Sequence, residues 1–272
     1  MRVHHLNCGT MRPLGGRLLD GSSGYLGRGR MVCHCLLVET ESDGLVLVDS
    51  GLGVADVTNP RGSLPTQFML LTNPVRDIEE TAVRQVIRLG YKPEDVRHIL
   101  LTHMDLDHAG GVRDFPNAKV HVYAEELRNA QAQANAADRM RFRTVQWSEA
   151  DFETYEADGD AWFGFEAVRN LKGLPPEILI VPLAGHTKGH AGIAVDTGEK
   201  WLLHCGDAYF FRGEMNPAQP HCTPLLRVFQ NVVQTDRGRR LANQDRLRSL
   251  VREHGDRVEV FSAHDSAELA RY

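Results

Sequence analysis

The side chains best suited to chemistry gather in the segment Thr102–Gly111, which reads THMDLDHAGG. Two imidazoles (His103 and His108) and two carboxylates (Asp105 and Asp107) fall within six residues. Nitrogen and oxygen donors of this kind suit zinc or a similar divalent cation, and burying them together without a cation would be costly. We interpret the segment as a metal site rather than a polar surface turn, because it directly follows an apolar run that predicts a buried strand.

Three further polar side chains follow apolar runs in the same way, each where a strand is predicted to end. They are His186 after residues 178–182, Asp207 after residues 201–204, and His264 after residues 258–262. Ligands that converge from several strand ends on one edge of a fold are typical of a two-metal hydrolytic centre. The sequence therefore predicts that these side chains join those of the first segment.

The elements that position these residues follow from hydrophobic periodicity and turn residues. Strands are predicted at 32–39, 45–48, 98–102, 117–123, 178–182, 191–196, 201–204 and 258–262. Helices are predicted at 81–89, 124–140 and 236–254, and residues 54–75, with three prolines, are predicted to form a long loop. Strands precede helices in both halves, which favours one α/β domain over residues 1–272 with sheets inside and helices outside.

Two segments are candidates for substrate selection because they are rich in apolar side chains. They are residues 54–75 and the aromatic stretch 142–165. Apolar lining favours an amphiphilic or acylated small molecule as the substrate. An equally weighted interpretation is that the aromatic side chains of 142–165 only cover helices.

Composition excludes several classes of protein. The chain has 272 residues, a formal charge of −5, 42% hydrophobic and 25% charged residues, which is ordinary for a globular protein. The acidity argues against nucleic-acid binding by phosphate neutralisation, and no run of about 18 apolar residues predicts a membrane helix. The N-terminus lacks the apolar core of a signal peptide, and five cysteines fit a reducing compartment, so we expect a cytoplasmic protein.

The Cys33-His34-Cys35 triplet has the composition of a metal motif, but its spacing is unusual for one. Zinc–thiolate sites typically separate their cysteines by two to four residues. In the predicted strand, Cys33 and Cys35 share one face and His34 points to the other. We therefore interpret these cysteines as small apolar core residues.

With these motifs in place, the chain resembles the metallo-β-lactamase fold superfamily from about residue 31 onward. The resemblance rests on the H-x-H-x-D-H signature, a Gly-His-Thr block, a Gly-Asp block, a terminal His and an early Asp-Thr-Gly turn. These map onto His103 to His108, His186, Asp207, His264 and Asp49-Ser50-Gly51. The Gly-Asp-Ala-Tyr and Ala-His-Asp segments look like those of the N-acyl homoserine lactonase branch. The resemblance implies an αββα sandwich of two mixed β-sheets with helices on the outer faces.

The resemblance also implies a ligand set for two divalent metal ions, with zinc as the first choice and iron or manganese as alternatives. One metal is assigned to His103 and His186, the other to Asp107, His108 and His264, and Asp207 bridges both. Asp105 takes the remaining ligand position, where most members have His; an extra carboxylate favours harder ions.

The resemblance extends to further roles near the ligands. Asp107 and Asp207 are the implied catalytic residues, and His190 is expected to lie behind the ligands. Tyr209 and Phe210 are candidates for substrate binding, although the family's tyrosine is three residues after the bridging Asp, where this chain has Phe210.

The function implied is a metal-dependent hydrolase that uses a dinuclear centre and a bridging hydroxide to open a lactone or ester of a small acylated molecule. Two alternatives stay open: an oxidoreductase like the mononuclear-iron persulfide dioxygenases, and a non-catalytic binding protein with a degraded site. We expect a small-molecule substrate, neither nucleic acid nor membrane as partner, and a homodimer as a candidate assembly.

Overall fold

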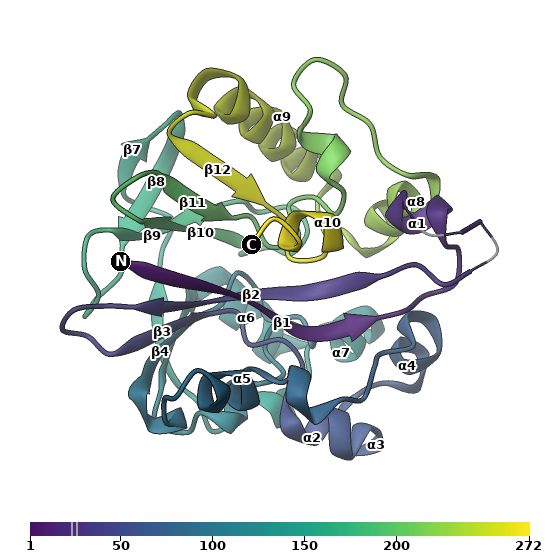
Figure 1. Ribbon diagram of the computed structural model, residues 1–272, viewed down its shortest axis with the longest axis horizontal. Helices are drawn as coiled ribbons and strands as arrows, with labels where there is room; N and C mark the ends of the chain where they lie inside the picture. Colours follow the sequence, from purple (N-terminus) through teal and green to yellow (C-terminus); the bar gives the residue numbers. More distant parts are fainter. Residues whose placement is uncertain (23, 26) are drawn as a thin grey trace.

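Two six-stranded β-sheets pack face to face, with helices on their outer faces, in the computed structural model (Figure 1). The structure describes residues 1–22, 24–25 and 27–272. In the first sheet the strands are, in order, β1 (Arg2–Met11), β2 (Met31–Glu39), β3 (Leu45–Val48), β4 (Val96–Leu100), β5 (Lys119–Tyr123) and β6 (Asp151–Tyr155). In the second they are β12 (Val258–Phe261), β11 (Trp201–His204), β10 (Ala191–Asp196), β9 (Ile178–Pro182), β8 (Phe165–Asn170) and β7 (Asp160–Trp162).

Helices connect and cover the strands. The α-helices are α1 (Arg17–Asp20), α2 (Val54–Thr58), α3 (Pro60–Ser63), α4 (Thr66–Thr72), α5 (Ala82–Arg88), α6 (Ala124–Ala132), α7 (Ala136–Arg141), α8 (Pro224–Val233), α9 (Arg237–His254) and α10 (Ser266–Leu269). Short 3₁₀ helices are η1 (Ile78–Glu80), η2 (Pro93–Asp95), η3 (Val112–Asp114), η4 (Thr144–Gln146) and η5 (Arg212–Met215). Within the described ranges, no helix has both the length and the apolar character needed to cross a membrane.

The central strands are buried on both faces, so the core consists of separate layers of side chains on the two faces of the sheets. In β2, Leu36 and Val38 pack between the sheets against residues such as Ile180. The alternate residues Cys35 and Leu37 pack on the helix-covered face of the first sheet. This period of two explains why the central strands are apolar almost throughout, since each side chain meets another layer. The predicted αββα sandwich is confirmed.

Several predicted elements are confirmed with their bounds. Strands β9, β10 and β11 occupy the predicted residues 178–182, 191–196 and 201–204, and β2 pairs with β3 as the predicted hairpin. The predicted strand 98–102 forms as β4, two residues earlier, so the segment from Leu101 onward is already part of the turn that carries the candidate ligands.

Residues 54–75 do not form the predicted long loop. They contain α2, α3 and α4, and the prolines start these helices: Pro60 occupies the first turn of α3, and Pro65 lies just before α4. The first turn tolerates proline because its backbone N–H groups have no partner within the helix. Reading proline as a loop signal was therefore wrong here.

The predicted helix 124–140 is broken into α6 and α7. Gln133 adopts a left-handed conformation with φ of 41°, and the side chain of Asn135 caps α7 by accepting a hydrogen bond from the backbone N–H of Asp138. Asn is a strong N-cap residue, so it starts a new helix here. Strand β1 and helix α8 were not predicted at all.

The strands that carry the candidate ligands end at one edge of the sandwich. Strands β3 and β4 run parallel in the first sheet, as do β11 and β12 in the second. Strand β9 points the same way as β11, because each is antiparallel to β10 between them. Their carboxyl ends therefore deliver side chains from both sheets to one place.

Candidate metal centre

All seven predicted ligands meet at this edge, and together they are called the ligand cluster. Its members, which come from the segments after β4, β9, β11 and β12, are His103, Asp105, Asp107, His108, His186, Asp207 and His264. The donor atoms of His103, Asp105, His186 and Asp207 lie within 4.8 Å of one another, as do those of His108, Asp207 and His264. Six of the seven side chains are buried and Asp107 is half-buried.

Asp207 lies at the centre and directs one carboxylate oxygen to each half of the cluster. Its Oδ2 is 3.3 Å from Nε2 of His186 and 3.7 Å from Nε2 of His103. Its Oδ1 is 3.3 Å from Nε2 of His108 and 3.1 Å from Nε2 of His264. The residues on the Oδ2 side, with Asp105, are called the first group; those on the Oδ1 side, with Asp107, are the second group.

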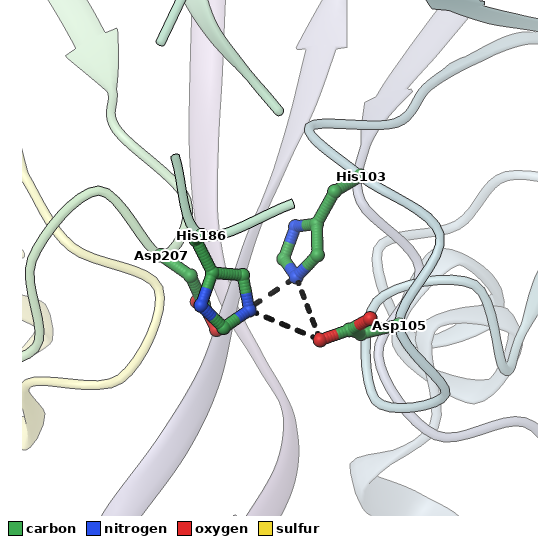
Figure 2. A group of neighbouring side chains, drawn as sticks. All are labelled: His103, Asp105, His186 and Asp207. Atoms are coloured by element: carbon green, nitrogen blue, oxygen red, sulfur yellow. Dashed lines mark hydrogen bonds and ion pairs between the residues drawn. The ribbon is translucent and has the colours of Figure 1, made fainter. Parts of the chain in front are cut away.

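In the first group, Asp105 faces two imidazoles, as Figure 2 shows. Its Oδ2 lies 3.4 Å from Nε2 of His103 and 3.0 Å from Nε2 of His186. The shorter side chain of Asp, compared with the usual His, therefore still reaches the other donors. The structure brings Asp105 into the cluster, as predicted.

In the second group, two imidazoles face each other across a gap lined by carboxylates. Nε2 of His108 is 3.3 Å from Nε2 of His264, and Oδ2 of Asp107 is 3.7 Å from Nε2 of His264. The Sγ atom of Cys33 lies within 4.8 Å of the donors of Asp107 and His264. The sequence interpretation of Cys33 as a core residue missed this proximity; it is buried, as expected, but at the border of the cluster.

The far nitrogen of three imidazoles is hydrogen-bonded to the surrounding fold, which directs Nε2 into the cluster. Nδ1 of His108 donates to Oδ2 of Asp49 at 2.8 Å, and Nδ1 of His264 donates to the carbonyl of Val32 at 2.7 Å. Nδ1 of His103 donates to Oγ1 of Thr102 at 3.0 Å, and that hydroxyl donates to Asp49. Such outer hydrogen bonds fix the tautomer and orientation of metal-binding histidines.

Asp49 is therefore the main outer support of the cluster, at the turn whose sequence resembles the family's Asp-Thr-Gly. Burial acts to raise the pKa of Asp49, but the imidazole of His108 outweighs it and lowers the pKa to about 2. Burial likewise acts to lower the pKa of His108, but the carboxylates of Asp207 and Asp49 raise it well above its ordinary value. The carboxylates around His108 thus favour a positive charge at this position.

Buried polar atoms without hydrogen-bond partners indicate that the residues of the ligand cluster fit divalent cations. Among the residues that the structure describes, Nε2 of His103 and Oδ1 of Asp207 are buried and have no hydrogen-bond partner. Unsatisfied buried polar atoms of this kind are rare and costly unless a cation or water satisfies them. Both atoms point at other donors of the cluster, so a cation there would satisfy them.

Cavities near the cluster are unequal in size. One of about 10 Å³ touches His264 and Phe210. A larger one, of about 390 Å³, lies between β9, α6 and α9 and touches His190 but none of the seven predicted ligands. Of the seven predicted ligands, only His264 lines the smaller cavity, and the donor atoms converge around Asp207 instead.

Comparison with known proteins agrees with this geometry. The family model described as the metallo-beta-lactamase superfamily matches residues 28–252, which is most of the chain. The chain belongs to the metallo-β-lactamase superfamily. The resemblance inferred from the sequence motifs is confirmed.

Relatives of this superfamily member are hydrolases by name. A probable metallo-hydrolase of Mycobacterium tuberculosis is 40% identical over 267 residues, covering 97% of this chain and 80% of the relative. An N-acyl homoserine lactonase of Bacillus cereus is 28% identical over 199 residues, covering 70% of this chain and 71% of the relative. The prediction of a metallo-hydrolase related to lactonases is confirmed at this level.

A solved structure shows the same fold. It is a crystal structure of a Bacillus thuringiensis AiiA mutant with N-decanoyl-L-homoserine bound at its active site. The TM-score is 0.71 at 21% identity, with 99% of this chain and 95% of that chain covered. At this identity the match shows the shared fold of the superfamily member and no more.

Of the two predicted substrate-binding residues near Asp207, Tyr209 does not lie where we expected it. The side chain of Tyr209 is fully buried, and its hydroxyl donates to Glu268, so the structure does not bring it to the cluster. Its prediction as a substrate-binding residue is corrected: of the two residues, Phe210 is the one whose ring contacts the ligands His186 and His264. The Phe210 ring stacks on His264 with centroids 5.3 Å apart.

His190 lies behind the ligands, as the resemblance implied. Its Nδ1 donates to the carbonyl of Leu183, and its Nε2 accepts a hydrogen bond from the backbone N–H of Asp207 at 2.9 Å. It therefore supports the strand end that carries Asp207.

The structure adds one residue to the site that the sequence analysis did not single out. Arg141, the last residue of α7, contacts both Asp105 and His186. A lone arginine at the end of a helix carries no sequence signal for such a role, because helices commonly end with basic residues.

Proposed function

We propose that this chain is a dinuclear metal-dependent hydrolase that opens a lactone or ester of a small acylated molecule, with zinc as the metal. The observation that carries the proposal is the position of Asp207. Its two carboxylate oxygens face two separate groups of nitrogen and oxygen donors at 3.1–3.7 Å. A carboxylate placed in this way is suited to bridging two cations.

Each half of the cluster would hold one cation. The first group supplies His103, Asp105 and His186, the second supplies Asp107, His108 and His264, and Asp207 belongs to both. Imidazole and carboxylate donors in this ratio suit zinc, and iron and manganese are compatible with the three carboxylates. When bound, the two cations would lower the pKa of an attacking water and polarise the substrate carbonyl.

Asp107 and Asp207 are the catalytic carboxylates in this proposal. Asp107 is the half-buried member of the cluster, so its oxygen can contact both the interior and an entering substrate. It is suited to orient the attacking water and to pass the proton on to the leaving alkoxide. Asp207 is held by His190 through its backbone, which fixes its carboxylate between the two groups.

An apolar path leads from the cluster to the surface and supports an acylated substrate. The Phe210 ring, stacked on His264, contacts the Phe229 ring of α8 with centroids 5.3 Å apart. Beyond it, Val228 and Val232 of α8 are 61% and 77% exposed. An acyl chain would cover such side chains while its carbonyl end lies at the cluster.

Residues 54–75 add a second exposed apolar surface. Leu70 and Leu71 of α4 are 76% and 72% exposed, although α4 is anchored to the core through Phe68. By contrast, the aromatic side chains of 142–165 pack inward, as Phe142 and Trp147 show in the core of the first sheet. We therefore place substrate selection on α4 and α8 and assign the aromatic side chains of 142–165 to core packing.

The names of the relatives support the hydrolase over the other candidates. The Bacillus cereus relative is a lactonase by name, and the AiiA mutant structure holds an acyl-homoserine. An iron dioxygenase would not need the second group, and a degraded binding protein would not keep seven converging donors. Neither alternative is favoured.

The test is an assay of the purified protein, prepared without chelators, against lactones of increasing acyl length and matched open-chain esters. We expect hydrolysis that a chelator abolishes and added zinc restores. Asp107→Ala should lower kcat/KM by about a hundredfold to ten-thousandfold without unfolding the chain. Asp256→Ala, which alters an exposed carboxylate in the turn before β12, is the matched control and should keep full activity. Unchanged turnover in Asp107→Ala would refute its assigned role.

A further inference from the structure

Arg141 contacts the first group of the ligand cluster directly. Its Nε donates to Oδ1 of Asp105 at 2.7 Å, and its Nη2 donates to Oδ2 of the same carboxylate at 2.6 Å. Nη2 also lies 2.9 Å from Nε2 of His186, and Nη1 donates to the carbonyl of Val233 at 3.0 Å. The Arg141 side chain is 15% exposed, so these contacts are largely shielded from solvent.

These contacts engage the same atoms that the first group would offer to a cation. Both carboxylate oxygens of Asp105 accept from the guanidinium, in the two-pronged geometry that makes arginine–carboxylate pairs strong. The lone pair of His186 Nε2 faces Nη2 of Arg141. A cation in the first group therefore has to compete with a permanent positive charge for two of its ligands.

The second group has no such competitor. Over residues 1–22, 24–25 and 27–272, no arginine or lysine forms a hydrogen bond or ion pair with Asp107, His108 or His264. Its outer partners are instead the carboxylate of Asp49 and the carbonyl of Val32, both of which favour a cation nearby. The two halves share Asp207 but differ in the charge of their surroundings.

We propose that Arg141 makes the two metal sites unequal, so that the second group binds its cation tightly and the first group binds weakly and fills last. The inference rests on the proposed metal centre and specifies the order of its loading. Arg141 acts as a positioning residue: it holds Asp105 in place by an ion pair and has to yield part of that pair when the first group takes up a cation.

The proposal also accounts for the replacement of the usual His by Asp105. An imidazole cannot form a two-pronged pair with a guanidinium, whereas a carboxylate can. Asp105 and Arg141 together carry no net charge. The carboxylate at this ligand position and the buried arginine thus form a matched pair in the first group.

The test measures how the metal-free protein binds zinc. Calorimetry gives the affinities, and metal analysis after dialysis against buffers of fixed free zinc gives the number of ions bound. We expect wild-type protein to retain one tightly held zinc per chain and to take up a second with weaker affinity. Arg141→Met should tighten the weaker site by about tenfold to a hundredfold, the usual effect of altering a neighbour of a ligand. Arg141→Lys keeps the charge and should leave the site weak.

Two further variants keep the test decisive. Arg141→Gln removes the charge but can still donate to Asp105, so it replaces Arg141→Met if that variant does not fold. Arg143→Met is the matched control, because Arg143 lies two residues away and its side chain donates hydrogen bonds to the backbone carbonyls of Ser63 and Arg139 rather than to the ligand cluster.

Three results would count against the account in different ways. Two equally tight sites in the wild type would overturn the inference. Weaker zinc binding in both neutral variants would also overturn it, by showing that Arg141 assists the first site. No zinc binding in any variant would instead overturn the proposed metal centre itself.

Discussion

Two sets of buried or half-buried histidines can be compared in this fold, and one of them combines its imidazoles with carboxylates. The ligand cluster combines four imidazoles with three carboxylates. The second set, called the inner histidine group, consists of His5, His34 and His204. There Nδ1 of His5 lies 2.8 Å from Nε2 of His34, and Nε2 of His204 donates to the carbonyl of His34.

The two sets differ in part in the direction of their pKa shifts: in the ligand cluster the pKa values of His108 and His264 are raised, although burial lowers that of His186 to about 4. Burial, aided by His204, lowers the pKa of His5 to about 4, and burial lowers that of His34 well below its usual range. In the ligand cluster burial acts the same way on His264, but the charge of Asp207 reverses it and raises the pKa. The carboxylates among the imidazoles, rather than a shared pKa shift, therefore distinguish the ligand cluster from the inner histidine group.

The largest expected effect comes from removing the shared carboxylate of the ligand cluster. In Asp207→Asn neither half keeps its central anionic donor, so we expect loss of both zinc ions and a fall in kcat/KM of at least about a hundredfold. Metal analysis and lactone hydrolysis measure this. A variant that kept two zinc ions would show that Asp207 does not join the two halves.

The next effect tests the outer support of the cluster. Asp49→Asn keeps the shape of the side chain but removes the charge that accepts from Nδ1 of His108. We expect zinc affinity in the second group to fall by about tenfold to a hundredfold, with a smaller change in the first. Equal losses at both sites would indicate a general structural defect, which the thermal unfolding midpoint would reveal.

A smaller effect is expected from substituting two phenylalanines, one of which stacks on a histidine of each set. Phe210 stacks on His264, and Phe261 stacks on His34 with centroids 4.7 Å apart. Phe210→Leu should raise KM for long-chain lactones by roughly tenfold, because it alters the apolar path. Phe261→Leu should leave KM unchanged and lower the free energy of unfolding by roughly 1 kcal/mol. The reverse pattern would place the substrate at the inner histidine group.

The smallest effect concerns acid stability of the inner histidine group. Because folding lowers the pKa of His34, the unfolded chain binds a proton below about pH 6.5 that the folded chain does not. The free energy of unfolding therefore decreases as the pH falls, by up to about 1.4 kcal/mol per pH unit for this histidine. His34→Leu should make that slope shallower between pH 6.5 and 5 in metal-free protein, as chemical denaturation at each pH would measure. An unchanged slope would show that His34 is not held neutral.

The sequence predicted the ligand cluster well because each ligand follows an apolar strand of ordinary length. The runs that end before His186 and Asp207 form strands with the predicted bounds, and all seven predicted ligands meet. Strand ends are visible in a sequence, since the change from apolar to polar residues marks them. That is why the convergence of the ligands on one edge could be predicted from the pattern, whereas their division between two metals was what the family resemblance implied.

What the sequence did not reveal are contacts made by residues distant along the chain. Arg141 and Asp105 are 36 residues apart, and Cys33 comes to the cluster from β2. No local pattern marks such partners, because their roles arise from tertiary packing. The short helices of 54–75 were missed for a related reason: their stability depends on packing, such as that of Phe68 against the core, rather than on periodicity.

The most direct test of the account is anomalous scattering at the zinc edge from crystals of protein purified without chelators and supplied with ample zinc. The account predicts a strong peak beside Oδ1 of Asp207, between His108 and His264, and a second peak beside Oδ2, near His103 and Asp105. A map without a peak at either position, with the ligand side chains ordered, would contradict the claim that this cluster is a metal centre.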